Sequence, residues 1–169
     1  MGPGPVFELC CGAGQIGLAA AVWSDRSLIQ VDLNPIACEF ARENAAAAGV
    51  ADRVEVRCTT IDRSVLEGEH FPLILADPPY LPSATTGRFP NDPQLSIDGG
   101  DDGLELARRC LDIVARALAV DGVALVQLAG LGQFNEIRSE LPSGLALGEV
   151  REFDPERAVG IFRRDRGQS

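Results

Sequence analysis

Four consecutive residues, Asp77-Pro78-Pro79-Tyr80, have the clearest potential for chemistry in this sequence. They follow the apolar run at residues 73–76, which predicts a short buried strand. Neither proline can donate a ladder hydrogen bond, so the chain must leave the sheet there. Asp77 and the Pro78 carbonyl could then accept the two N–H bonds of a planar amide or amino group, against the ring of Tyr80. The local alternative is a plain turn, because Asp-Pro is a common turn dipeptide.

The elements that would position this corner alternate between strand and helix. Alternation of this kind indicates an α/β fold with a doubly wound, mainly parallel sheet, and we expect one domain over residues 1–169. The C-terminal part predicts a closing antiparallel strand pair around a turn at 154–156. The chain before the first strand is expected to be a flexible or expression-derived lead, at residues 1–5. The predicted strands are 6–10, 28–32, 54–56, 73–76, 122–128, 145–153 and 158–163, and the predicted helices are 12–23, 34–48, 104–118 and 134–141.

A glycine-rich turn links the first strand to the first helix, where Trp23 is expected to pack at the helix end. Gly12 and Gly14 would let the backbone approach a ligand closely, although tight packing alone would explain them equally well. Asp32 ends the second strand about 20 residues later, which is the geometry for holding ribose hydroxyls. In an open α/β sheet, the carboxyl end of the strands is where ligands bind.

The segment from 81 to 102 is rich in Pro, Gly, Asp, Ser and Thr and predicts no regular element. A loop of this length is usually functional or mobile. Its acidic end, at residues 98–102, precedes a predicted helix, whose N-terminus favours negative charge. The loop follows directly from the corner at 77–80, so we expect it to be mobile without acceptor and to cover the site when acceptor binds.

Composition narrows the function classes. The chain has 15 basic and 25 acidic residues and a net charge of −10, which makes a nucleic acid a less favoured partner. Five scattered cysteines and one histidine argue against a zinc site and favour a reducing, cytoplasmic compartment, and no metal is expected. The apolar runs are far shorter than the roughly 20 residues of a membrane span, so no membrane partner is expected.

The combined pattern resembles the class I S-adenosylmethionine-dependent methyltransferases, from about residue 7 to residue 163. The resemblance implies S-adenosyl-L-methionine as cofactor, S-adenosyl-L-homocysteine as product and a Rossmann-like methyltransferase sheet. It also implies that Thr60 or Asp62 flanks the adenine, a choice that the sequence leaves open. The other cofactor-binding residues implied are Glu8, Cys10, Gly12 and Gly14 at the methionine part, and Asp32 and Leu33 at the ribose.

Within that family, Asp/Asn-Pro-Pro-Tyr is typical of enzymes that methylate a planar nitrogen. The resemblance therefore implies catalytic roles for Asp77, Pro78 and Tyr80, with Pro79 completing the acceptor site. The segments Leu81-Pro82-Ser83, Asp92-Pro93 and Asp98-Gly99-Gly100-Asp101-Asp102-Gly103-Leu104 are most similar to the release-factor glutamine N5-methyltransferases. Asp77 stands where these enzymes usually have Asn, and Cys10 stands where the usual cofactor turn has its first glycine. The family's N-terminal substrate-recognition domain has no counterpart here, so only the catalytic domain is matched.

The sequence therefore predicts an S-adenosylmethionine-dependent N-methyltransferase whose acceptor is a protein glutamine amide, for example in a peptide-chain release factor. Two other acceptors stay open: the N6 nitrogen of adenine in RNA or DNA, and a small-molecule nitrogen. A non-enzymatic alternative is a cofactor-binding regulatory domain. Turnover of labelled cofactor with candidate acceptors would separate the enzymatic hypotheses from the last one.

Overall fold

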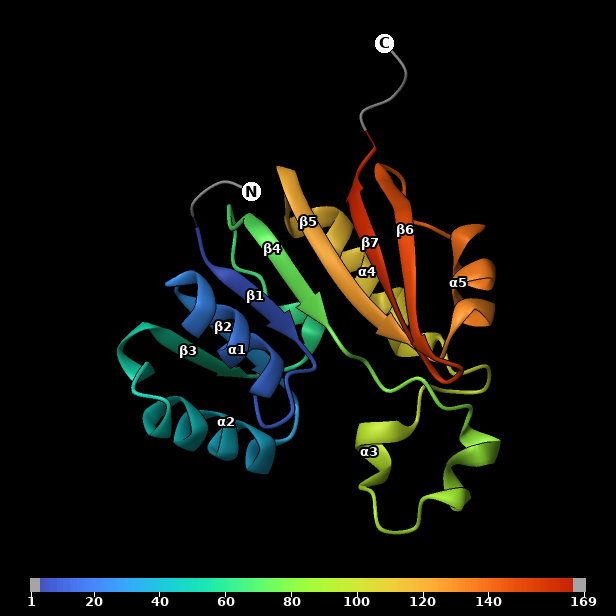
Figure 1. Ribbon diagram of the computed structural model, residues 1–169, viewed down its shortest axis with the longest axis horizontal. Helices are drawn as coiled ribbons and strands as arrows, with labels where there is room; N and C mark the ends of the chain where they lie inside the picture. Colours follow the sequence, from blue (N-terminus) through green and yellow to red (C-terminus); the bar gives the residue numbers. More distant parts are fainter. Residues whose placement is uncertain (1–3, 166–169) are drawn as a thin grey trace.

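The computed structural model describes residues 4–165, which form a seven-stranded sheet with helices on both faces (Figure 1). Most of the lead predicted at residues 1–5 lies outside the described part. The strands lie side by side in the order β3-β2-β1-β4-β5-β7-β6. The strands are β1 Val6–Leu9, β2 Leu28–Asp32, β3 Val54–Cys58, β4 Phe71–Ala76, β5 Leu118–Leu128, β6 Leu145–Asp154 and β7 Arg157–Arg164. The helices are α1 Gln15–Ser24, α2 Pro35–Ala47, α3 Gln94–Ile97, α4 Glu105–Ala117 and α5 Leu131–Arg138, with short 3-10 turns η1 Ala51–Arg53, η2 Ile61–Arg63 and η3 Ser83–Arg88.

The sheet has a parallel part and an antiparallel edge, as the sequence predicts. β1 pairs in parallel with β2 on one side and with β4 on the other, and β3 and β5 extend the parallel part outward. β7 is antiparallel to β5, and β6 is antiparallel to β7. The strand order reverses between β1 and β4, and ligands bind at such a switch point, beyond the carboxyl ends of the strands. The doubly wound fold class is confirmed, while a single domain over residues 1–169 stays a prediction.

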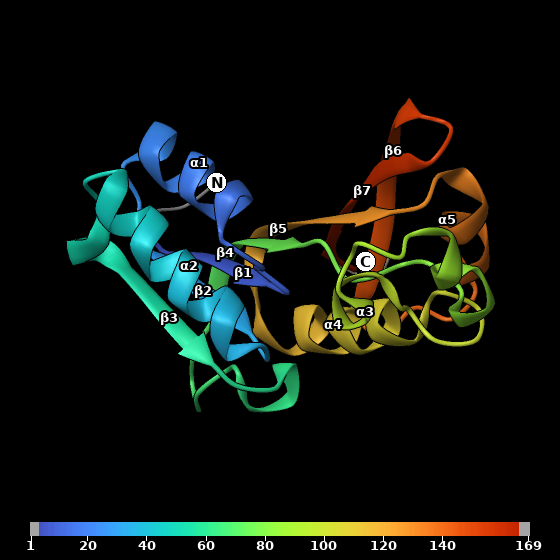
Figure 2. The ribbon, with the colours of Figure 1, turned by 90° about the horizontal axis from the view of Figure 1, so that it is seen from below.

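Two apolar clusters cover the two faces of the sheet. The larger one joins α4 and α5 to alternate residues of the strands, among them Phe7 and Phe71, whose rings stack with centroids 4.2 Å apart. The smaller one packs α1 and α2 against the other face, through residues such as Leu18 and Leu28. Figure 2 shows α1 and α4 on opposite sides of the sheet. Burial of both faces explains why the central strands are continuously apolar instead of alternating.

Local sequence signals set the bounds of α2. The Asn34 side chain accepts a hydrogen bond from the Ile36 N–H at 3.0 Å, and Pro35 occupies the first turn, where its missing N–H costs nothing. Gly49 follows the helix with φ of +71°, a left-handed conformation that favours glycine. The predicted helix start and the Gly49 cap are therefore confirmed.

Several predicted boundaries are wrong. β4 begins at Phe71 and includes Pro72, because the pairing with β5 shifts register between Phe71 and Leu73, and such an irregularity accommodates a missing N–H. β5 starts directly after α4, at Leu118 rather than at residue 122, and α5 covers Leu131–Arg138 rather than residues 134–141. The segment at 81–102 is not free of regular structure, since it contains η3 and α3.

The expectation for Trp23 is also wrong. Its side chain is 87% exposed in the last turn of α1, where it faces away from the sheet. The buried residues of this helix are Gly17, Leu18 and Ala21. With the contact face made by small residues, α1 lies close to the sheet and leaves Trp23 on the outer side.

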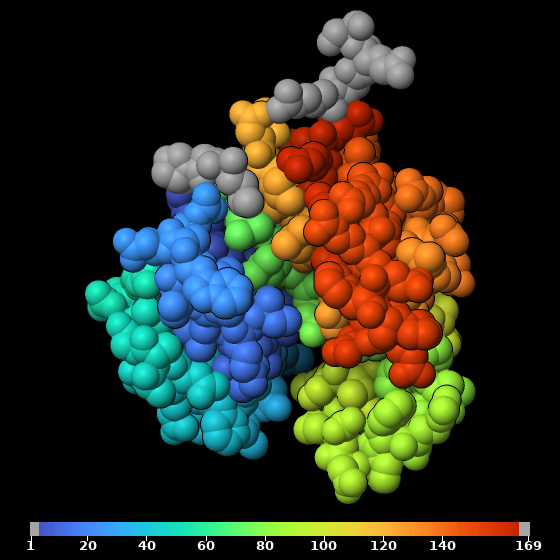
Figure 3. Space-filling view, in the orientation of Figure 1, coloured from blue at the N-terminus to red at the C-terminus, as the bar shows by residue number. Residues whose placement is uncertain are grey.

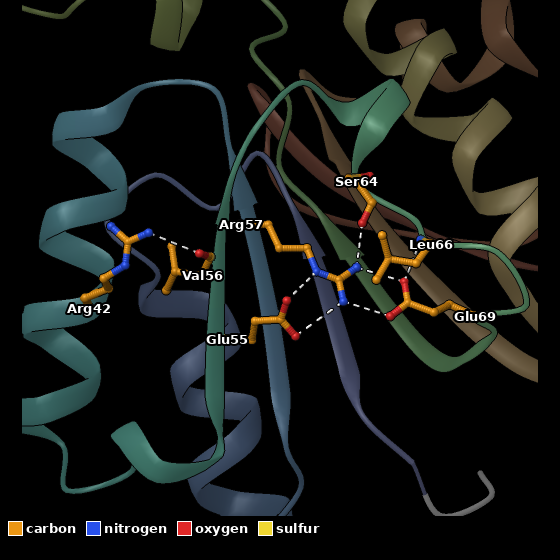
Figure 4. A network of polar contacts seen from close by, with 7 residues as sticks. All are labelled: Arg42, Glu55, Val56, Arg57, Ser64, Leu66 and Glu69. Atoms are coloured by element: carbon orange, nitrogen blue, oxygen red, sulfur yellow. Dashed lines mark hydrogen bonds and ion pairs between the residues drawn. The ribbon is translucent and has the colours of Figure 1, made fainter.

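An ion-pair network fixes the segment between β3 and β4 (Figure 4). Arg57 on β3 bonds both oxygens of Glu69, at 2.7 and 2.8 Å, and donates to the Ser64 carbonyl at 2.6 Å. Glu55 holds the same guanidinium from the other side, at 2.8 Å. Bidentate Arg–carboxylate pairs are geometrically specific. The network therefore anchors the connection that begins at the end of β3, which carries one wall of the site described next.

Candidate active site

A cavity of about 390 Å³ opens at the carboxyl ends of the central strands. Its volume lies in the range of small-molecule sites, roughly 300–1,000 Å³. Figure 3 shows the surface hollowed between the α1–α2 side of the molecule and the yellow-green segment around α3. Eight of the residues predicted for the site line this cavity: Glu8, Cys10, Gly12, Asp32, Leu33, Thr60, Asp77 and Pro79. Four others are absent from the lining: Gly14, Asp62, Pro78 and Tyr80.

The turn after β1 is shaped by left-handed backbone conformations. Cys10, Gly12 and Gly14 have φ of +56°, +53° and +85°. A Cβ on Gly14 would also lie 2.9 Å from Gln30 Oε1, so glycine is required by both conformation and space. Gly14 caps α1, which explains its sequence signal by packing rather than by direct ligand contact. Gly12 instead faces the cavity.

Glu8 links this turn to the sheet. Its carboxylate accepts hydrogen bonds from the Gly17 N–H at 2.9 Å and from Gln30 Nε2 at 2.7 Å. Burial raises the pKa of Glu8 to about 7, and the bonds from Gln30 and Gly17 act in the opposite direction. Glu8 lines the cavity floor, but these contacts show that it also fixes α1 against β1 and β2.

Asp32 occupies the predicted place at the end of β2. One oxygen accepts the Gly12 N–H at 2.8 Å, and the other accepts the Asn34 N–H at 2.9 Å. An ionised carboxylate has about four acceptor positions, so both oxygens can still accept hydrogen bonds from the hydroxyl groups of a ligand. The two backbone bonds hold the carboxylate in a fixed orientation at the cavity wall.

The structure separates the two candidates for the adenine side. Thr60 and Ile61 line the cavity, in the connection between β3 and the residues that Arg57 anchors. Asp62 instead forms an ion pair with Arg109 of α4, at 2.5 Å. Arg109 is itself part of the lining. The geometry thus favours Thr60 over Asp62 as the residue beside a ligand.

Asp77 stands where β4 leaves the sheet. The ladder with both neighbouring strands ends at Ala76, so the Pro78 carbonyl lies beyond it, as predicted. Asp77 Oδ1 accepts a hydrogen bond from Gln127 Nε2 at 2.9 Å. Burial raises the pKa of Asp77 above its ordinary value, while the Gln127 bond and the nearby Arg157 lower it. The carboxylate is therefore partly desolvated but held by a donor.

The chain after Pro79 is fixed by close backbone contacts. A Cβ on Gly99 would lie 2.7 Å from the Pro79 carbonyl oxygen, and one on Gly103 would lie 2.5 Å from that of Tyr80. Gln133 of α5 donates to the same Tyr80 oxygen at 2.9 Å. The glycines noted in the loop are thus explained by the close approach of two backbone segments.

The segment 81–103 also reaches the cavity. It is tied back to the corner by a bridge between Leu81 and Asp98, and by a bond from the Ser83 hydroxyl to Asp98 of 2.6 Å. Leu95 and Ser96 of α3 then form part of the cavity wall. α3, inside this loop, thus borders the cavity, whereas the mobility of the loop and its closing over the site when acceptor binds stay predictions.

Sequence reasoning missed the residues that reach the site from later elements. They come from α3, α4, β5 and α5, and their individual residue types carry no motif. An amide at the end of a buried strand, as at Gln127, is the one local signal that could have been noticed, because buried polar groups need a partner. The missed residues are Leu95, Ser96, Leu106, Arg109, Gln127 and Gln133.

Nothing in residues 4–165 points to a metal or a membrane. This part of the chain contains no group of three or more His, Cys, Asp or Glu side chains placed to hold a metal ion. None of its helices combines the length and apolar character needed to cross a bilayer.

Comparison with known proteins identifies the fold and the domain. Residues 6–85 match a family described as a methyltransferase domain. The structure is similar to that of the ribosomal protein L11 methylase from Lactobacillus delbrueckii subsp. bulgaricus, with a TM-score of 0.71 at 17% sequence identity. That likeness covers 98% of this chain and 72% of the other. At this identity it establishes the fold alone.

Two curated relatives are more similar in sequence. The ribosomal protein uL3 glutamine methyltransferase of Francisella tularensis is 32% identical over 129 residues, which are 73% of this chain and 40% of that protein. The release factor glutamine methyltransferase of Bradyrhizobium diazoefficiens is 38% identical over 119 residues, which are 67% of this chain and 39% of that protein. The chain thus spans less than half the length of these relatives. The resemblance read from the sequence is confirmed: this chain carries a methyltransferase domain, and it is similar in sequence to part of the glutamine methyltransferases named above.

Proposed function

We propose that this chain transfers a methyl group from S-adenosylmethionine to a planar nitrogen, and that the nitrogen is the side-chain amide of a protein glutamine. The observation that carries the proposal is the position of Asp77. Its carboxylate borders the cavity that Gly12 and Asp32 also line, and the Pro78 carbonyl follows beyond the sheet ladder. The two curated relatives, both named as glutamine methyltransferases, support this acceptor.

The residues of the cavity fit S-adenosylmethionine. A fixed carboxylate at Asp32 suits the ribose hydroxyls, and the Gly12 turn allows close approach of the methionine part. Leu33, Thr60 and Ile61 supply wall for the adenine. When bound, the cofactor supplies an electrophilic methyl group on a sulfonium sulfur.

At the corner, Asp77 and the Pro78 carbonyl accept the two N–H bonds of the amide. This fixes the plane of the amide and directs its nitrogen toward the methyl group, while Tyr80 packs on that plane. As the N–C bond forms and the S–C bond breaks, positive charge grows on the nitrogen, and the Asp77 carboxylate stabilises it more than in the ground state. The surplus proton becomes acidic only after transfer and leaves to Asp77 or to water.

We infer that the partner is a protein, with a basic surface favoured by the net charge of −10. The acceptor protein is a release factor or ribosomal protein uL3, since these are the substrates that the names of the relatives state. The working compartment that we propose is the cytoplasm. The adenine alternative rests on the Asp-Pro-Pro-Tyr pattern alone and is tested beside the peptide.

The test is single-turnover transfer of labelled methyl to glutamine peptides from a release factor and from uL3, and to an adenine oligonucleotide. Asp77→Ala should slow transfer by roughly 10²–10³, by analogy with the loss of one preorganised polar group, and should leave cofactor affinity nearly unchanged. Asp77→Asn keeps an acceptor oxygen and should retain much more activity. If Asp77→Ala transfers methyl at the wild-type rate, the segment at 77–80 is only a turn and has no catalytic role. If wild type transfers methyl only to the oligonucleotide, the acceptor is adenine and not glutamine.

Cofactor binding is tested separately by calorimetry. Asp32→Ala should weaken binding of S-adenosylmethionine by about 1.5–3 kcal/mol, the range for hydrogen bonds to a charged group. Asp112→Ala is the matched control, because Asp112 is an exposed carboxylate of α4 that is absent from the cavity lining. Thermal unfolding of both variants shows whether each still folds. Equal affinity in the two variants would remove Asp32 from the site.

A further inference from the structure

A second polar side chain enters the acceptor corner from the neighbouring strand. Gln127 lies near the carboxyl end of β5, one residue after Val126, which pairs with Ala76 at the end of β4. Asp77 follows Ala76 directly, so the two side chains leave adjacent strands at the same level and on the same face. Their 2.9 Å hydrogen bond joins Gln127 Nε2 to Asp77 Oδ1.

We propose that Gln127 is a positioning residue for the Asp77 carboxylate. Gln127 binds one carboxylate oxygen and leaves the other oxygen for the N–H group of the acceptor. This rests on the function proposed above. An ionised carboxylate only accepts hydrogen bonds, so the Gln127 amide must present its N–H group, and its own orientation is fixed as well. Because β5 is held between β4 and β7, the donor sits on a rigid element, which is what accurate orientation requires.

The charges around the pair decide how the carboxylate titrates. Three other ionisable groups interact electrostatically with Asp77: Glu8 on β1, Tyr80 after β4 and Arg157 at the start of β7. Burial raises the pKa of Asp77, and Gln127 is the larger of the two influences that lower it, ahead of Arg157. Removing the amide donor should therefore move the titration of Asp77 to higher pH.

The pair also gives a reason for an aspartate, rather than an asparagine, at position 77. An amide at position 77 needs a neighbour that accepts its N–H group, so that its oxygen turns to the acceptor. A carboxylate at position 77 needs a neighbour that donates, and Gln127 does so. The identity of residue 77 is therefore coupled to that of residue 127, and exchanging the two should preserve the geometry.

The contact is tested first without any acceptor. The side-chain carboxyl carbons of isotopically labelled protein are titrated by NMR, in wild type and in Gln127→Leu, which keeps the size but removes the donor. The pKa of Asp77 should be higher in the variant. The control Gln94→Leu removes a donor from another carboxylate, that of Asp98 at 3.2 Å, and should leave Asp77 unchanged. An unchanged Asp77 titration in Gln127→Leu would overturn the proposal.

Methyl transfer to the glutamine peptide then separates positioning from folding. Gln127→Leu should slow transfer at neutral pH by roughly 10- to 100-fold, from the loss of one bond to a charged group, and shift the low-pH limb of the rate upward. Gln127→Glu places two carboxylates together, so it should also slow methyl transfer and shift the low-pH limb of the rate upward. The exchanged pair, Asp77→Asn with Gln127→Glu, should recover at least about 10-fold over Gln127→Glu alone, because one charge and one donor are restored.

An exchanged pair no faster than Gln127→Glu would overturn the positioning role, provided that calorimetry shows both variants binding S-adenosylmethionine. A wild-type protein that transfers methyl to none of the acceptors would instead refute the proposed function. In that case the NMR titration still decides whether Gln127 holds the carboxylate.

Discussion

Gly17 offers the sharpest test of how the turn after β1 is built. It lies in the first half of α1, and its N–H bonds to Glu8 at 2.9 Å. A Cβ at this position would overlap the Glu8 carboxylate and lie 2.9 Å from Leu28 Cδ1. Glu8 cannot simply move away, because Gln30 holds its second oxygen at 2.7 Å. Gly17→Ala should therefore be destabilising even though alanine favours helix formation.

The size of the effect follows from three contributions. Forcing one carbon into a packed site costs about 1–3 kcal/mol. Displacing the Glu8 carboxylate weakens hydrogen bonds to a charged group, worth about 1.5–3 kcal/mol. The higher helix propensity of alanine returns about 1 kcal/mol. The free energy of unfolding should fall by about 1.5–5 kcal/mol in total.

The measurement is denaturant unfolding at pH 8, which lies above the Glu8 pKa of about 7, so that the carboxylate is ionised. Gly132→Ala is the matched control, because Gly132 also lies in a helix and a Cβ there meets no atom within 4 Å. The control should gain up to about 1 kcal/mol. A Gly17→Ala protein as stable as wild type would show that the close approach of α1 to Glu8 does not limit this position.

Two further predictions concern stability. Glu69→Gln should remove a pH-dependent contribution to the free energy of unfolding. Arg57 lowers the pKa of Glu69 in the folded protein, so the ion pair stabilises the fold fully above the unfolded pKa near 4.5. This stabilisation is lost as the pH falls through the folded pKa. Unfolding at pH 7 and pH 3.5 checks this, with the exposed Glu152→Gln as control, and an unchanged pH dependence would contradict it. The Cys10→Gly protein should be about 1 kcal/mol more stable than the Cys10→Ala protein, because the backbone at residue 10 has φ of +56°, which strains any residue with a Cβ. Equal denaturation midpoints for the two variants would show that this strain is absent.

Much of the fold could be predicted from local signals. Continuous apolar runs marked the central strands, and the Asn34-Pro35 start and the Gly49 end marked α2. Bounds failed where a tertiary contact overrode a local rule. Pro72 belongs to β4 because an irregularity in the pairing accepts it, and Trp23 is exposed because smaller residues of α1 make the contact with the sheet.

The sequence by itself determined the residues of the proposed acceptor corner and of one side of the proposed cofactor site. Asp77, the prolines after it and Asp32 lie at strand ends, and a strand end is a local property of the chain. Only the tertiary structure decided which groups complete the site. Gln127 lies 50 positions from Asp77, and Arg109 lies 47 from Asp62. Such pairs depend on strand order and helix placement, which many residues set together, so no short motif could reveal them.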